Sequence, residues 1–142
     1  NPRSWDHCLI VLETGGIRIV HWGDNRHDPP EDIWKALGHI DIALLPIDAS
    51  QHVMGHVHTA HIIETLKPRV IIPHHYYIWD VVQRQSTLQT CEAWVEAYDE
   101  KETFLTPTKV YELKGLENLD RVVHFFGDNL AFNKETWLRE GR

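Results

Sequence analysis

Residues 17–25 have the sequence IRIVHWGDN, a β-branched run that ends in a polar turn. Such a run predicts a strand. Gly23 lets the backbone turn sharply, where most residues could not. We therefore expect Asp24 to project from the end of a rigid strand, which is where α/β proteins place their chemistry. A solvent-exposed Asp in an ordinary strand-to-helix turn is the alternative interpretation.

A second predicted strand ends in a similar way, at residues 69–76, RVIIPHHY. Pro73 ends its pairing, because proline cannot donate to a sheet ladder. His74 and His75 follow, so this strand also delivers side chains that can bind a metal. Between the two stretches, residues 41–47 are nearly all apolar, which predicts a central strand covered on both faces.

Helical patterns lie between these strands and after them. The predicted helices cover about residues 30–37, 53–66, 87–98 and 134–140. The second would place Val57, Ala60 and His61 along one stripe. Ser86 or Thr87 would cap the third.

Four more short strands complete the predicted elements, at about residues 8–12, 104–106, 109–113 and 121–126. Thr14-Gly15-Gly16 joins the first of them to the strand at residues 17–20, which is a hairpin signal. The sequence contains no internal repeat and no low-complexity linker. We therefore predict one α/β domain that covers residues 1–142.

The composition limits the classes of partner. A formal charge of −7 argues against general affinity for nucleic acid or anionic membrane, which needs clustered Lys and Arg. No apolar run approaches the ~20 residues of a membrane span. Cys8 and Cys91 are predicted to be reduced, buried thiols, and with no visible signal peptide this favours a cytoplasmic protein. The chain starts at Asn1 without a methionine, which leaves open a missing natural N-terminus.

The order of these pieces resembles the C-terminal half of the metallo-β-lactamase superfamily, particularly its L-ascorbate-6-phosphate lactonase-like branch. The resemblance covers roughly residues 6–80, and its motifs are His21–Asp24, Asp41–Ile47, Met54-Gly55, Leu66–Pro68 and Ile72–Tyr76. It implies half of an αββα sandwich, a mixed β-sheet with helices packed on one face.

The resemblance also implies a site. Asp24 would bridge two zinc ions, and His75 would complete the coordination of the second ion. The sequence alone does not exclude a swap between His74 and His75. His21, Asn25 and His74 are candidates to hold the metal ligands in place or to contact substrate. The family chemistry is hydrolysis of a small ester, lactone or phosphorylated substrate through a metal-bound hydroxide.

One departure from the family pattern limits what this chain does alone. The other family ligands lie in a His-x-His-x-Asp-His motif upstream of the Gly-Asp turn, and only twenty-three residues precede Asp24 here, with no such motif. Two ligands are too few for a tight zinc site. We therefore predict the C-terminal part of a zinc hydrolase, inactive as this chain alone. The alternative is a non-catalytic binding or assembly module that pairs with another chain.

Two further expectations concern the surface. The spacing of His52/His56 and of His58/His61 would let either pair share a helix face. The His56-x-His58 spacing resembles a metal motif, but a polar helix face over solvent explains it better. The strands carry enough apolar residues for both sheet faces, whereas the helices cover only one. We therefore expect an exposed apolar sheet face, covered by a homodimer partner or by a missing N-terminal half. The competing expectation is that segments after Tyr77 cover it.

Overall fold

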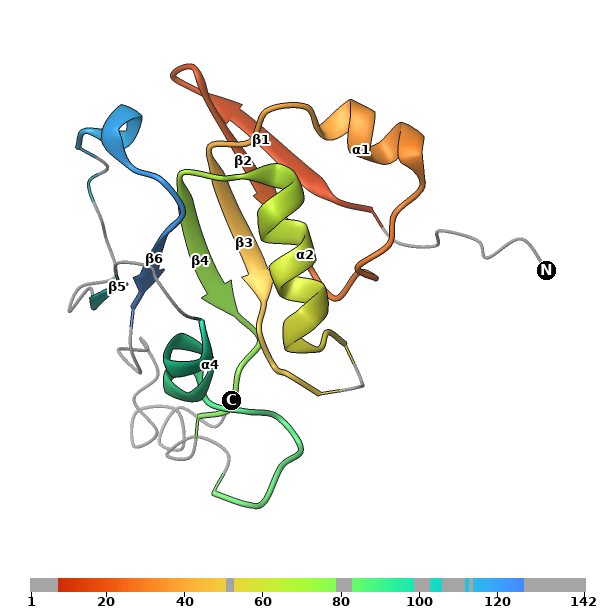
Figure 1. The fold of residues 1–142 in the computed structure, drawn as a ribbon, viewed down its shortest axis with the longest axis vertical. Coiled ribbons are helices and arrows are strands. Elements are labelled where there is room, and N and C mark those ends of the chain that lie inside the picture. Colours follow the sequence, from red (N-terminus) through yellow and green to blue (C-terminus); the bar gives the residue numbers. More distant parts are fainter. Residues whose placement is uncertain are drawn as a thin grey trace, which may run out of the picture.

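A six-stranded mixed sheet forms the centre of the fold in the computed structural model (Figure 1). The structure describes residues 8–50, 53–78, 83–98, 103–105, 112 and 114–126. The strands are β1 (Ile10–Thr14), β2 (Ile17–His21), β3 (Ile42–Pro46), β4 (Val70–His74), β5 (Thr103–Leu105) and β6 (Val122–Phe125). The helices are α1 (Glu31–Leu37), α2 (His56–Leu66), α4 (Cys91–Ala97) and the short 3-10 turn η1 (Leu116–Asn118).

The strand order is β1-β2-β3-β4-β6-β5, with only the β1–β2 pair antiparallel. In the parallel part, Val20 of β2 lies opposite Ala43 of β3, which lies opposite Ile71 of β4. Parallel strands end at the same edge of a sheet. The residues that follow β2, β3 and β4 are therefore brought together, although they are far apart in the sequence.

Helices α1, α2 and α4 share one core with one face of the sheet (Figure 1). Helix α2 contributes Ile62, Ile63 and Leu66 to it, while Leu37 comes from α1 and Trp94 from α4. The predicted mixed sheet with helices on one face is confirmed. No helix in the described ranges is long and apolar enough to cross a membrane.

The opposite sheet face, which we call the open face, carries a second apolar cluster. Its buried members are Ile42, Val70, Leu116 and Val122, with Ile17, Ile19, Leu44, Ile72 and Leu119 packed against them. Turn η1 covers one end of this face through Leu116. The rest forms a concavity of about 340 Å³. Ile10 and Leu12 of edge strand β1 are 53% and 56% exposed.

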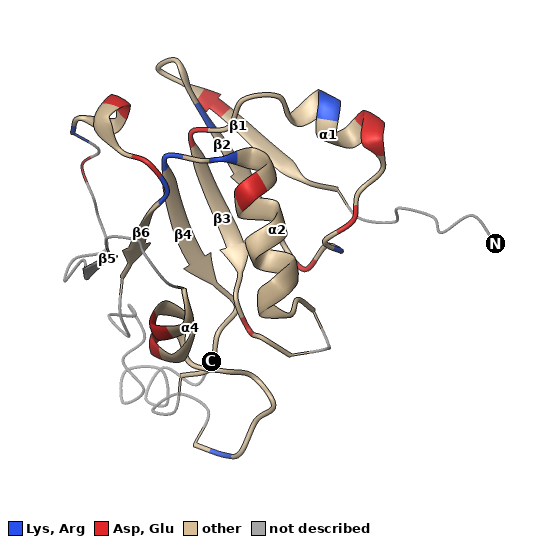
Figure 2. Cartoon of the chain, in the orientation of Figure 1, with Lys and Arg blue, Asp and Glu red and all other residues tan. Residues whose placement is uncertain are grey.

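The open face changes the interpretation of β3. This strand is central, as predicted, and β3 and β4 carry no charged residue (Figure 2). Leu44 nevertheless lines the concavity. The prediction that residues 41–47 are covered on both faces is therefore wrong for that part of β3, because the helices of the described chain pack on the other side.

Two predictions about the helices are wrong. Val57 is 80% exposed, since the sheet-facing stripe of α2 consists of Thr59, Ile62, Ile63 and Leu66. The cap of α4 is Thr90, whose hydroxyl accepts a hydrogen bond from Ala93 N at 3.2 Å. The hydroxyl of Ser86 instead accepts from Leu88 N within the preceding turn.

Several other predictions are settled only in part. Both cysteines are free, but Cys8 is exposed while Cys91 is buried, so the predicted burial of Cys8 is wrong. The strand predicted at 104–106 is β5, one residue earlier. The terminal helix at 134–140 and most of the strand at 109–113 lie outside the described residues.

Candidate metal centre

The turn after β2 is fixed by buried neighbours of Asp24. Trp22 is fully buried, and its indole nitrogen donates to the Arg26 carbonyl at 3.1 Å. Gly23 has φ +62°, a left-handed conformation that suits glycine. Asn25 is 3% exposed and its amide donates to the carbonyls of Trp22 and Cys8, at 2.6 and 3.1 Å. Asn25 therefore holds the turn together, and the Asp24 side chain is left 63% exposed.

His75 faces this carboxylate from the turn after β4. Its Nε2 lies 3.9 Å from Asp24 Oδ1. The backbone of His75 has φ 54°, a left-handed conformation that is uncommon for a residue other than glycine. The structure thus brings Asp24 and His75 to the same edge of the sheet, 51 positions apart in sequence.

His74 lies elsewhere, on the open face. Its ring stacks on that of His21, with 4.7 Å between the ring centroids. Burial, with the neighbouring His21 and His75, lowers the pKa of His74 to about 4. The Nδ1 atom of His21 accepts a hydrogen bond from Gly23 N at 3.0 Å. Of the two histidines that the sequence left interchangeable, it is His75 that faces Asp24.

Asp48 is a second acid at this edge, and it was not predicted from the sequence. It follows β3 and is fully buried. Its Oδ2 lies 4.0 Å from His75 Nδ1 and accepts a short hydrogen bond from the Ser50 hydroxyl. Its Oδ1 accepts from Met54 N at 3.2 Å. The signal was present, because an acid at the carboxyl end of a buried strand is the pattern that identified Asp24.

The distance between Asp24 and His75 can be compared with metal geometry. Zinc binds nitrogen and oxygen at about 2.0–2.2 Å, so two ligands at a tetrahedral angle lie about 3.4 Å apart. The observed 3.9 Å is wider by half an ångström, a difference that a side-chain adjustment closes. Within the described ranges, however, no group of three or more His, Cys, Asp or Glu side chains is placed to hold a metal. Asp24 and His75 therefore fit one side of a metal site, not a whole one.

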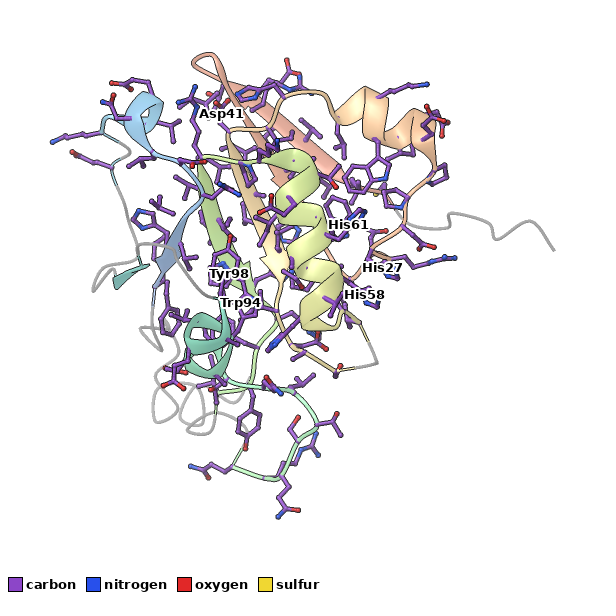
Figure 3. All side chains as sticks on the ribbon, viewed as in Figure 1. His27, Asp41, His58, His61, Trp94 and Tyr98 are labelled. Carbon is purple, nitrogen blue, oxygen red and sulfur yellow. The ribbon has the colours of Figure 1, made fainter. Side chains whose placement is uncertain are left out.

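Within the described residues, no other histidine completes a metal-binding group with this pair. His58 of α2 stacks on His27 with 3.5 Å between ring centroids, and His61 contacts the edge of Trp34 (Figure 3). Burial, and then His58, lowers the pKa of His27. His61 is exposed and so is not part of the buried stripe on which it was predicted, and His58 packs on His27 and does not face only solvent. His52 lies outside the described residues.

Comparisons with known proteins agree with this architecture. The model of the family described as "Beta-lactamase superfamily domain" matches residues 3–75, about half of the chain. A metal-dependent hydrolase of Thermococcus onnurineus is 40% identical over 73 residues, which are 51% of this chain and 32% of that protein. A metal-dependent hydrolase of Methanosarcina mazei is 30% identical over 104 residues, 73% of this chain and 44% of that protein.

A solved structure shares the fold. It is that of a candidate Zn-dependent hydrolase of the metallo-beta-lactamase superfamily from Thermotoga maritima, with a TM-score of 0.65 and 24% identity. The match covers 81% of this chain and 56% of that one. The chain thus spans between a third and a half of the length of these curated relatives. On the family match and the shared fold, this chain belongs to the beta-lactamase superfamily domain family.

Proposed function

We propose that this chain is the C-terminal part of a metal-dependent hydrolase in which Asp24 and His75 bind the metal. The observation that carries the proposal is the 3.9 Å approach of these two side chains at one edge of the sheet. Two relatives are named metal-dependent hydrolases, which supports the same reaction class. The free thiols of Cys8 and Cys91 support a cytoplasmic location as part of the proposal.

Zinc is the metal that this donor pair suits, because histidine nitrogen and carboxylate oxygen are both common zinc ligands. When bound, zinc lowers the pKa of water so that hydrolysis proceeds at neutral pH. By its resemblance to the lactonase-like branch, the substrate would be a small ester, lactone or phosphorylated compound. By the same resemblance, Asp24 would hold the metal through its exposed carboxylate, with a bridging role if two ions are bound.

The chain alone should be inactive, because zinc sites normally take at least three protein ligands. The remaining ligands would come from another protein segment. The open face supports that view, since Ile10 and Leu12 are exposed beside an apolar concavity. We propose that a homodimer partner or an N-terminal half covers this face.

Metal binding tests the site. Zinc titration by calorimetry should show weak binding to the wild-type chain and none to Asp24→Ala or His75→Ala. His61→Ala is the matched control, because this exposed histidine on α2 lies outside the pair and its loss should leave the titration unchanged. Tight stoichiometric zinc that survives both site substitutions would contradict the assignment.

The second candidate function is an assembly module without catalysis, which the same open face favours. Sedimentation equilibrium at micromolar concentration separates the possibilities. A homodimer through this face should be weakened by Leu12→Glu. It should not be weakened by Val57→Glu, which places the same charge on the helical side. A monomeric wild-type chain would rule out the homodimer. If the wild-type chain and Asp24→Ala bind zinc equally well, Asp24 is not a metal ligand, and the assembly module is favoured.

A further inference from the structure

The two ring nitrogens of His75 face different acids. Nε2 points toward Asp24 at 3.9 Å, and Nδ1 lies 4.0 Å from Asp48 Oδ2. Nδ1 is buried and makes no hydrogen bond within the described part of the chain. A buried ring nitrogen without a partner is destabilising, because it has lost its hydrogen bonds to water without replacing them. The nearest acid on that side of the ring is the carboxylate of Asp48.

Asp48 is well suited to serve as a fixed acceptor. Its side chain is fully buried, and the Ser50 hydroxyl and Met54 N–H hold its two oxygens. The Asp48 carbonyl also accepts from Gln89 N at 2.9 Å, so the backbone is tied to the segment before α4. An ionised carboxylate accepts about four hydrogen bonds, which leaves room for a third donor.

We propose that Asp48 is the positioning residue for His75. It accepts the Nδ1–H of His75, and this fixes the ring so that the Nε2 lone pair faces Asp24 and the metal. The ring has to move by about 1 Å to bring Nδ1 to hydrogen-bond distance from the present 4.0 Å. The inference rests on the proposed function, since it gives His75 the orientation that a metal ligand needs.

The arrangement follows a general rule of metal sites. A metal-binding histidine donates its other ring N–H to a carboxylate or carbonyl, which selects the tautomer and raises the basicity of the ligand. The competing explanation is that Asp48 only closes the loop between β3 and α2 through Ser50 and Met54. That explanation predicts no effect of Asp48 on the protonation pattern of the His75 ring.

Nitrogen-15 NMR of the metal-free chain distinguishes the two explanations. At about pH 8, where histidines are mostly neutral, wild-type His75 should carry its proton on Nδ1. Asp48→Asn should shift the ring toward the Nε2–H tautomer. Ser50→Ala is the matched control, because it removes a partner of Asp48 but keeps the carboxylate, and the tautomer should remain Nδ1–H.

Zinc titration of the same variants gives the second readout. Loss of such a partner typically weakens metal binding 10–100-fold, and we expect this for Asp48→Asn. An Nε2–H tautomer in the wild-type chain would overturn the inference, even if Asp48→Asn fails to fold. An unchanged tautomer in a folded Asp48→Asn would also overturn it. If the tautomer depends on Asp48 but the wild type binds no zinc, the proposed function fails and the positioning role stands.

Discussion

Replacement of Asp41 by alanine should lower the free energy of unfolding and leave metal binding at the candidate metal centre unchanged. Asp41 lies at the amino ends of the parallel strands (Figure 3). Its carboxylate accepts from Arg18 N at 2.9 Å and contacts His39 Nε2 at 2.9 Å and Arg69 Nε at 3.3 Å. Its backbone carbonyl accepts from the amides of Arg69 and Val70. The buried residue Asp41 thus links the amino-terminal parts of β2, β3 and β4.

The cost can be worked from these contacts. The hydrogen bond from Arg18 N to a charged acceptor contributes about 1.5–3 kcal/mol. The pairs with His39 and Arg69 contribute about 0–1 kcal/mol each, since those side chains are 61% and 33% exposed. Asp41→Ala should therefore lower the free energy of unfolding by about 1.5–5 kcal/mol, and Tm by roughly 5–17 °C.

The pH dependence provides a second check of the same contacts. Burial alone would raise the pKa of Asp41, but the hydrogen bond from Arg18 N, with His39 and Arg69, lowers it below its usual value. The folded state therefore favours the charged form. This stabilisation is complete above the unfolded-state pKa of 3.8 and is lost as the pH falls through the lower folded-state pKa. The difference between wild type and Asp41→Ala should shrink below about pH 4.

Urea unfolding monitored by tryptophan fluorescence measures both effects. Glu31→Ala is the matched control, because it removes an ion pair with Lys35 of 2.7 Å whose side chains are 82% and 73% exposed. That change should cost less than about 1 kcal/mol. If Asp41→Ala lowers the free energy of unfolding no more than Glu31→Ala does, the buried Asp41 carboxylate and its hydrogen bond from Arg18 N do not stabilise the sheet.

Three further outcomes follow from other parts of the structure. Gly23→Ala should lower the free energy of unfolding by about 1–2 kcal/mol, because of its left-handed φ, and should weaken zinc binding. Gly15→Ala, at φ +56°, should lower the free energy of unfolding by a similar amount in urea but leave the zinc titration unchanged. Because the pKa of His27 is lowered, the unfolded state takes up its proton first as the pH falls below about 6.5, so stability should drop there. His27→Gln should make that drop smaller. If stability depends on pH in the same way in the wild type and in His27→Gln, the drop does not come from His27. Thr90→Ala should lower unfolding free energy by about 1 kcal/mol through loss of the α4 cap, and an unchanged urea midpoint would show that the cap is not needed.

The sequence predicted those parts of the fold whose causes are local. The β-branched runs defined β2 and β4, and Gly23 follows the end of β2 as predicted. The prediction that Pro73 ends the pairing of its strand is wrong, because Pro73 and His74 still pair with Leu45 and Pro46 of β3. The apolar run of residues 41–47 defined β3 and its central position. The runs placed metal-capable side chains at two strand ends, and the resemblance to the metallo-β-lactamase superfamily singled out Asp24 and His75 among them.

The missed features depend on contacts between distant segments. Asp48 was not predicted because its importance comes from His75, which approaches it only when β3 and β4 lie side by side. The stripe on α2 was assigned to the wrong residues because helical spacing does not say which side meets the sheet. The choice between His74 and His75 likewise required the structure, in which His75 faces Asp24 and His74 stacks on His21.

The separation between Asp41 and the Asp24–His75 edge has an evolutionary consequence. Five-residue strands at about 3.3 Å per residue put roughly 16 Å between the anchor and the loops that carry the acids and histidines. Substitutions that far apart without shared partners act additively on stability. Outside Asp24, Asp48 and His75, the loops after β2, β3 and β4 can therefore vary in sequence while the anchored ends of the strands stay unchanged.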